Sequence, residues 1–239
     1  WLIAHADEAL DEQRVDLFLT HANARASGEP LAYVLGYRDF WTLRLAVNQH
    51  VLIPRRETEH LVEWAIECID AGAHTALDLG TGSGAIALAC KSEHPATQVT
   101  GVDLSSEALL CARKNSRSLD LDVDWRLGDW FQAVPGMRWD VVMSNPPYIA
   151  ADDVHLNRGD LPAEPDTALV GGETGLEAIE QIVKQAPEAL NRAGWLLIEH
   201  GYDQAEAVVG LLRSSGFKCV ETRQDWSHQA RVTGGQWLN

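Results

Sequence analysis

From residue 75 onward, short apolar runs alternate with longer segments in which apolar residues recur three or four positions apart. The short runs predict buried strands and the longer segments predict helices. The predicted strands are residues 75–79, 98–104, 122–127, 139–144, 194–201, 218–223 and 231–238, and the predicted helices are residues 85–93, 106–116, 175–190 and 204–215. Such alternation predicts an α/β fold with a doubly wound, mostly parallel, seven-stranded sheet that helices cover on both faces.

The pattern before residue 75 predicts two further parts. Residues 1–35 predict a small helical domain, because apolar side chains in residues 11–26 recur at helical spacing before a Ser-Gly-Glu-Pro sequence. Residues 36–55 predict a linking β-hairpin, since aromatic and branched side chains are frequent there. Residues 56–239 would then form the sheet domain. The chain starts with Trp1 rather than methionine, so we expect the N-terminal domain to be truncated.

The charge of the chain makes duplex nucleic acid a poor first candidate for a partner. The chain has nineteen basic and thirty-five acidic residues, which gives a net charge of −16. Sequence-independent binding to phosphate backbones depends on Lys and Arg, so we expect no direct binding of duplex nucleic acid. No stretch approaches the roughly 18 apolar residues of a membrane span, and no signal pattern opens the chain. We therefore expect a soluble, cytoplasmic protein without a membrane partner.

Cysteine and histidine spacing predicts no metal centre. The cysteines form no C-x-x-C pair and lie far apart, at Cys68, Cys90, Cys111 and Cys219. We expect four buried thiols in a reducing compartment rather than a zinc site or a disulfide framework. The nine histidines are scattered and form no H-E-x-x-H motif.

A glycine-rich turn, residues 78–84 (DLGTGSG), follows the predicted strand 75–79. Glycines let a backbone turn tightly and come close to a ligand. No Gly-Lys-Ser/Thr sequence follows, so the turn is not a P-loop. With Ala85 in the last place it also fits the loose dinucleotide pattern G-x-G-x-x-G/A, which leaves NAD open as a ligand at this point.

Polar and aromatic residues follow the next two predicted strands. Asp103 ends the second strand, where a carboxylate can accept hydrogen bonds from both ribose hydroxyls. Its alternative role is to cap the following helix, although Ser105 can supply that cap. Asp129 and Trp130 follow the third strand and can meet the exocyclic amine and the face of a purine, whereas simple packing is the other role open to Trp130. Together these residues predict an adenosine site.

The sequence SNPPY, residues 144–148, ends the predicted strand 139–144. Two prolines cannot continue a central strand, so they predict a stiff turn. A primary amide nitrogen is a poor nucleophile, and its methylation requires both N–H groups to be held so that the lone pair faces a sulfonium methyl. The side-chain oxygen of Asn145 and the carbonyl of Pro146 can accept these N–H groups while Tyr148 packs on the planar amide. A rigid turn without a ligand is the other interpretation.

These motifs resemble known sequences. DLGTGSG, VDLS, GDWF and SNPPYI, in this order, resemble the class I, Rossmann-like S-adenosylmethionine-dependent methyltransferases that act on planar amino groups. GEPLAYVLGYRDFW (28–41), LIPRRETEHLVE (52–63) and EHG (199–201) resemble the HemK/PrmC family of protein-(glutamine-N5) methyltransferases, over nearly the whole chain. The chain departs from that family's pattern at Arg56, where the family has proline, and at Pro162-Ala163, where it has Arg-Phe.

The resemblance implies a substrate, a cofactor and a set of site residues. The substrate would be the glutamine of the Gly-Gly-Gln loop in class I peptide-chain release factors, and residues 56–239 would be the methyltransferase domain. The residues implied to contact S-adenosylmethionine are Gly80, Thr81, Gly82, Ser83, Gly84, Asp103, Trp130 and Asn145. The residues implied to bind the glutamine are Asn145, Pro146, Pro147 and Tyr148, of which Asn145, Pro146 and Tyr148 would be catalytic.

Three alternatives keep parts of this interpretation. A nucleic-acid amino-methyltransferase acting on adenine N6, cytosine N4 or guanine N2 would use the same fold, but the acidic charge counts against it. An NAD-dependent oxidoreductase accounts only for the glycine turn. A non-catalytic adaptor with a methyltransferase fold gives no role to the intact Asn145.

Two further segments bear on the site. The long loop 151–175 directly follows the SNPPY turn, and we expect it to cover the glutamine and to close against the partner. Gly234-Gly235-Gln236 repeats the substrate tripeptide near the C-terminus. It lies in a predicted strand that would keep Gln236 away from the cleft of its own chain, so we expect no self-modification.

Overall fold

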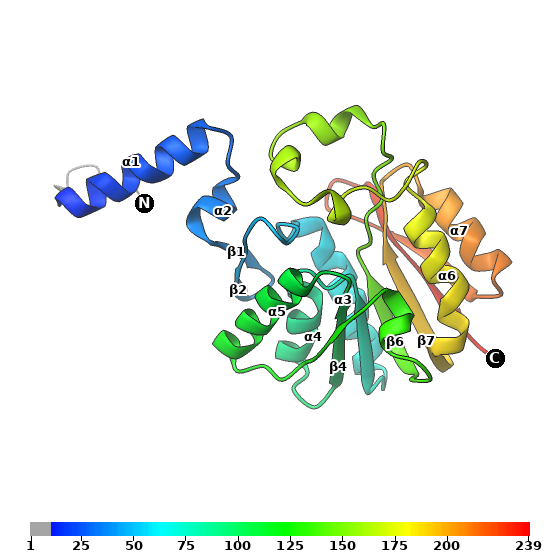
Figure 1. Ribbon diagram of the computed structural model, residues 1–239. Coiled ribbons are helices and arrows are strands. Elements are labelled where there is room, and N and C mark those ends of the chain that lie inside the picture. The colour runs from blue at the N-terminus through cyan, green and yellow to red at the C-terminus, as the bar shows by residue number, and fades with distance from the viewer. Residues whose placement is uncertain (1–10) are drawn as a thin grey trace.

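A mixed sheet of seven strands organises the protein (Figure 1). The computed structural model describes residues 11–239, so the first ten residues of the predicted N-terminal domain lie outside it. The strands follow the order β5-β4-β3-β6-β7-β9-β8. All pairs from β5 to β7 are parallel, and β9 pairs antiparallel with both β7 and β8. The predicted doubly wound, mostly parallel, seven-stranded sheet is therefore confirmed.

The strands of this sheet are β3 (Thr75–Leu79), β4 (Gln98–Asp103), β5 (Asp124–Leu127), β6 (Trp139–Ser144), β7 (Leu190–Glu199), β8 (Lys218–Gln224) and β9 (Ala230–Trp237). The helices around it are α3 (Glu59–Asp70), α4 (Ala85–Glu93), α5 (Ser106–Leu119), α6 (Glu177–Ala189) and α7 (Ala205–Ser214). Before them come α1 (Glu12–Ala26), α2 (Leu31–Leu35) and the hairpin of β1 (Tyr37–Phe40) and β2 (Leu43–Ala46). The predicted helix over 11–26 and the predicted hairpin are both present.

The core has one layer on each face of the sheet. Successive side chains of a strand point to opposite faces, so Ala76 packs with α3 and α4 while Leu77 packs with α6 and α7. The central strands β3, β4 and β6 are buried on both faces, which explains their near-continuous apolar runs. This burial fixes the position of each strand along its own axis. The turns after β3, β4 and β6 therefore lie together at the carboxyl ends of the strands.

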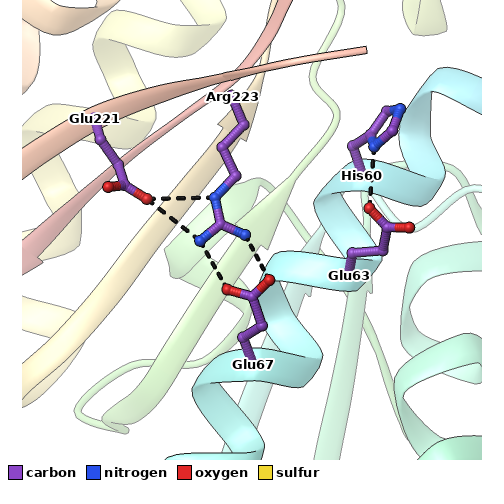
Figure 2. Close-up of polar contacts among 5 residues, drawn as sticks. All are labelled: His60, Glu63, Glu67, Glu221 and Arg223. Atoms are coloured by element: carbon purple, nitrogen blue, oxygen red, sulfur yellow. Dashed lines mark hydrogen bonds and ion pairs between the residues drawn. The ribbon is translucent and has the colours of Figure 1, made fainter. Parts of the chain in front are cut away.

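An arginine from the edge strand β8 links helix α3 to the sheet. Arg223 forms two hydrogen bonds with Glu67 on α3, at 2.9 and 2.7 Å, and also pairs with Glu221 (Figure 2). Its guanidinium carbon lies 4.1 Å from the ring centroid of Trp64. A bidentate pair that also stacks on an aromatic ring has a fixed geometry. The contact therefore fixes the helix that begins directly after Thr58.

The structure differs from the sequence prediction around residue 190. The predicted helix 175–190 ends at Ala189, and β7 begins at Leu190 rather than at Gly194. Leu190 has extended dihedrals, pairs with Trp139 on β6 and accepts a hydrogen bond of 2.7 Å from Arg138. Helix and strand thus follow each other without a loop. Local periodicity does not reveal this pairing partner.

The prediction of four buried thiols is wrong in part. Cys90 and Cys111 are buried, but Cys68 is half-buried and Cys219 is exposed. Cys219 lies on the edge strand β8, at a shift in register between β8 and β9, and has a φ of 49°. A bulge of this kind turns a side chain away from the alternation expected of a regular strand. All four cysteines are free.

No helix within residues 11–239 is long and apolar enough to cross a bilayer.

Candidate active site at the carboxyl ends of the parallel strands

The glycine turn after β3 is built from backbone hydrogen bonds to the neighbouring strand. The N–H groups of Gly80 and Thr81 both donate to the carbonyl of Val102 at 2.9 Å. Gly80 and Gly82 have φ values of 73° and 57°, which L-residues with a side chain adopt rarely. At Gly80 an added Cβ would lie 3.3 Å from the indole of Trp130. The turn therefore needs glycine for its conformation, and at Gly80 also for the close approach of Trp130.

The side chain of Asp78, near the end of β3, also holds the glycine turn. Its carboxylate accepts hydrogen bonds from the Thr81 hydroxyl at 2.5 Å and from the Ala87 N–H at 3.2 Å. Complete burial raises the pKa of Asp78 to about 7, against the opposing effect of these hydrogen bonds. Its second oxygen, Oδ1, has no hydrogen-bond partner within residues 11–239.

Asp103 joins the end of β4 to the glycine turn. One carboxylate oxygen accepts the Gly82 N–H and the other accepts the Ser105 N–H, each at 2.8 Å. Ser105 caps α5, because its side chain accepts the N–H of Ala108. Capping of α5 therefore does not depend on Asp103. Burial raises the pKa of Asp103, and the hydrogen bonds from Ser105 and Gly82 oppose this shift.

A cavity of about 420 Å³ opens in front of these turns. This volume lies in the range of about 300–1,000 Å³ that is typical of small-molecule sites. Predicted site residues that line the cavity are Gly80, Thr81, Gly82, Ser83, Asp103, Trp130, Asn145 and Pro147, and Asp129 also lines it. Gly84 is not among the lining residues. It caps α4 with a φ of 84°, and a Cβ there would lie 2.9 Å from Trp125.

Two residues of the SNPPY turn line a second, smaller cavity. This cavity has a volume of about 60 Å³ and is lined by Asn145 and Tyr148 together with Leu52, Arg55, Ile149, Leu161, Ala168 and Leu169. Asn145 lines both cavities and is the predicted site residue that joins them. Pro146 is buried and lines neither cavity. Burial raises the pKa of Tyr148 above its ordinary value, and nearby Glu199 raises it further.

The backbone of the turn is also contacted by Gln204 and by the loop 151–175. The carbonyl of Tyr148 accepts a hydrogen bond of 3.0 Å from the side chain of Gln204. A Cβ on Gly171 would lie 2.4 Å from the carbonyl oxygen of Pro147, and one on Gly175 would lie 2.4 Å from that of Tyr148. Both glycines are thus required for the loop 151–175 to pack against the turn.

An ion pair fixes the loop 151–175 to the segment before α3. The buried carboxylate of Glu164 accepts the Ile53 N–H at 2.9 Å and pairs with Arg55. The loop contains three short 3-10 helices at Val154–Asn157, Leu161–Ala163 and Asp166–Ala168. Its middle helix contributes Leu161 to the smaller cavity, and the end of its last helix contributes Ala168. The loop therefore forms part of the wall around Tyr148.

Two polar residues near Asn145 are buried. The Asn145 amide nitrogen donates to the hydroxyl of Thr58 at 3.1 Å. Thr58 and Glu199 are 4% and 1% exposed. Burial raises the pKa of Glu199 to about 7.

Comparison with known proteins identifies the family. The family model for the "Methyltransferase small domain" matches residues 61–160. A release factor glutamine methyltransferase of Xylella fastidiosa is 45% identical over 238 residues, which cover 99% of this chain and 86% of that protein. One from Pseudomonas aeruginosa is 51% identical over 214 residues, covering 89% and 78%. The chain belongs to the release factor glutamine methyltransferase family.

Solved structures support the fold assignment. A methyltransferase from Pyrococcus furiosus matches with a TM-score of 0.62 at 16% identity, over 96% of this chain and 100% of that chain. A T. thermophilus 16S rRNA methyltransferase in complex with AdoMet and guanosine matches with a TM-score of 0.59 at 18% identity, over 84% and 49%. At these identities the likeness shows the fold alone, and the predicted class I methyltransferase fold is confirmed.

The sequence analysis does not predict every residue of the site. Thr58, Glu164 and Glu199 lie in or near motifs named above. The hydrogen-bond partner of Thr58 is 87 positions away in the sequence. The two partners of Glu164 are 109 and 111 positions away. The Gly171-Gly172 pair was the available signal for a close backbone approach. Within residues 11–239 there is no group of three or more His, Cys, Asp and Glu side chains that could hold a metal ion.

The internal Gly-Gly-Gln sequence lies where the prediction placed it. Gly234 and Gln236 are on β9, paired with Leu197 and Trp195 of β7. The Gln236 amide donates to the carbonyl of Ala193 at 2.9 Å. Its position in the sheet gives no reason to expect self-modification.

Proposed function

We propose that this protein transfers a methyl group from S-adenosylmethionine to the side-chain amide of a glutamine in a class I peptide-chain release factor. One observation supports this reaction most directly: Asn145 lies where the larger cavity meets the smaller one. An amide acceptor at that junction can be held between a cofactor on one side and an aromatic ring on the other. The names of the curated relatives agree with this reaction.

The residues around the larger cavity fit an adenosine-containing cofactor. After accepting two backbone N–H groups, the Asp103 carboxylate retains lone pairs that can accept hydrogen bonds from ribose hydroxyls. Gly80 and Gly82 bring the backbone close to the cavity, and Trp130 offers an aromatic face. We assign these residues, with Thr81, Ser83 and Asn145, to cofactor binding and give Gly84 an indirect role in shaping the turn. When bound, S-adenosylmethionine supplies an electrophilic sulfonium methyl group.

We assign the glutamine amide to the smaller cavity. The Asn145 side-chain oxygen and the Pro146 carbonyl would accept its two N–H groups, while Tyr148 packs on its plane. Pro147 would lie between the glutamine and the cofactor, because it lines the larger cavity. Because the turn is rigid, these acceptors are oriented before the substrate binds. No strong general base is required in this scheme, since orientation supplies most of the rate enhancement. No metal ion has a part in it.

We propose that the loop 151–175 covers the glutamine after the Gly-Gly-Gln loop of the release factor has entered. The Arg55–Glu164 pair holds this loop beside the smaller cavity. Release factors act on the ribosome, so we expect the reaction to take place in the cytoplasm. We also propose the domain division expected from the sequence, with residues 1–35, 36–55 and 56–239 as helical domain, linker and methyltransferase domain.

Transfer of labelled methyl groups tests this function. The purified protein is incubated with labelled S-adenosylmethionine and one of four substrates: a release factor, the same factor with its Gly-Gly-Gln glutamine replaced, total RNA, or DNA. We expect label on the intact factor alone. Label on nucleic acid alone would contradict the proposal and would instead indicate an amino-methyltransferase of nucleic acids.

A further inference from the structure

We propose that Asn115 is a positioning residue for the cofactor, because its side-chain amide joins two walls of the larger cavity. One wall is the glycine turn after β3, and the other is the segment 47–55 that follows the hairpin. Asn115 is not among the lining residues, so it acts through the backbone of these two walls. The inference rests on the proposed function only in taking the larger cavity as the site of S-adenosylmethionine.

Asn115 is a polar residue on the buried face of α5. The buried residues Ala112, Cys111 and Ala108 precede it by three, four and seven positions, which places all four side chains on one side of the helix. Asn115 is 2% exposed. A buried amide destabilises a protein unless its donors and its acceptor have partners. The partners of Asn115 therefore indicate why this face of α5 carries an asparagine.

The first partner of Asn115 is the end of the hairpin. Its Oδ1 accepts the Ala46 N–H at 2.7 Å, and its Nδ2 donates to the Ala46 carbonyl at 3.0 Å. Ala46 is the last residue of β2, and α5 packs beside this strand (Figure 1). Two hydrogen bonds to one residue fix both the distance and the orientation of the hairpin end. The segment 47–55 starts directly after this fixed point.

The second partner of Asn115 is the glycine turn. Its Nδ2 also donates to the Ser83 carbonyl, at 2.9 Å. In a regular helix this carbonyl would accept the Ala87 N–H, four positions later. That N–H donates to the Asp78 carboxylate at 3.2 Å instead, which leaves the Ser83 carbonyl for a side chain from another element. Ser83 is buried and lines the larger cavity, so this contact reaches the cavity wall.

Asn115 thus connects walls that are otherwise held separately. Within residues 11–239, no other side chain hydrogen-bonds both the hairpin and the glycine turn. The segment 47–55 has its own contacts, since the Tyr33 hydroxyl donates to the Val51 carbonyl at 2.6 Å. The Ile53 N–H donates to Glu164 at 2.9 Å. Asn115 therefore sets the separation of the two walls, and a site of fixed width binds its ligand at a lower entropic cost.

The first test uses Asn115→Leu, which keeps a side chain of similar size without donors or an acceptor. Calorimetry on the full chain measures the Kd for S-adenosylmethionine, which should rise about tenfold. In methyl transfer, the KM for S-adenosylmethionine should rise by a similar factor, while kcat and the KM for the release factor stay within about threefold. A cofactor Kd within about threefold of the wild-type value would overturn the inference.

Asn191→Leu is the matched control for a merely structural effect. The half-buried Asn191 amide donates to Asp140 at 2.7 Å, near the starts of β7 and β6 and thus at the opposite end of the strands from the cavity. Both variants lose a side-chain amide, so both should have a lower melting temperature. Asn191→Leu should nevertheless keep the wild-type Kd. An equal rise in Kd in the two variants would assign the effect to lost stability and overturn the positioning role.

The second test uses the wild-type protein and does not depend on the folding of Asn115→Leu. Hydrogen exchange, followed by NMR, compares the Ala46 and Gly82 amides with and without S-adenosylmethionine. Ala46 does not line the cavity, and its N–H donates to Asn115. We expect the cofactor to slow exchange at both amides, because Asn115 joins their segments. Slower exchange at Gly82 with none at Ala46 would show that the walls move independently and would overturn the inference.

The two proposals can fail separately. A wild-type protein that leaves the release factor unlabelled would overturn the proposed function. The calorimetric Kd and the exchange rates need no release factor, so they decide the role of Asn115 in either case.

Discussion

The amide of Asn145 is the smallest unit on which the account depends. Its oxygen is assigned to the acceptor glutamine, and the cofactor has further contacts around the larger cavity. Replacing Asn145 with alanine should therefore reduce kcat by about 100-fold or more and change the Kd for S-adenosylmethionine by less than about threefold. Asn157→Ala, on an exposed part of the loop, is the matched control. Loss of cofactor binding in a folded Asn145→Ala protein would instead assign Asn145 to the cofactor alone.

Asp78 should make stability depend on pH. Its pKa is raised from 3.8 to about 7 in the folded protein, mainly by burial. The folded state therefore binds the proton more tightly, and this stabilisation is complete below the unfolded pKa and lost as pH rises through about 7. Between about pH 8 and pH 6, the wild type should gain about 1 kcal/mol of unfolding free energy relative to Asp78→Asn. Urea unfolding at both pH values measures this difference. A constant difference would contradict the raised pKa.

At the residue scale, the sequence is sufficient where the chemistry is local. The Asp103 and glycine-turn positions follow from strand ends and turn requirements, and both line the same cavity. Thr58 and Glu164 could not be assigned in this way. Their partners Asn145 and Arg55 lie 87 and 109 positions away, and only the folded sheet brings them together.

The loop 151–175 is the element whose position most affects substrate access. Its link to the rest of the site is Glu164, whose buried carboxylate binds Ile53 and Arg55. Glu164→Gln should increase hydrogen exchange across the loop and lower kcat/KM for the release factor about tenfold, because it leaves Arg55 without its charged partner. Glu173→Gln, at an exposed position of the same loop, should have neither effect. Unchanged exchange in Glu164→Gln would show that the pair does not hold the loop.

Element bounds were most predictable where burial and turns agree. Residues 75–79 and 85–93 have the predicted bounds, because an apolar strand, a glycine turn and a helix follow each other there. The sequence pattern does not predict the start of β7, because Leu190 belongs to the strand through its pairing with Trp139. The three short 3-10 helices of the loop were not predicted either. Two residues beside them, Glu164 and Val170, pair with Arg55 and Ile149, and periodicity does not reveal such contacts.

At the scale of the whole molecule, α1 contributes little to the stability of the rest. No residue of α1 is buried, and its Arg25 pairs with Asp160 on the loop at 2.8 Å, where both side chains are well exposed. Such a pair contributes at most about 1 kcal/mol. A chain that starts at Pro30 should therefore melt within about 4 °C of the present chain, as measured by calorimetry. A much larger decrease would show that α1 is part of the same cooperative unit as the sheet.

The central claim is that the junction of the two cavities orients a glutamine amide of a release factor for N-methylation. Fragmentation mass spectrometry of the factor, after incubation with this protein and S-adenosylmethionine, tests it most directly. We predict one added methyl group on the side-chain amide of the Gly-Gly-Gln glutamine, and none after incubation with Asn145→Ala. A methyl group on any other residue, or an unmodified factor with the wild-type protein, would contradict the account.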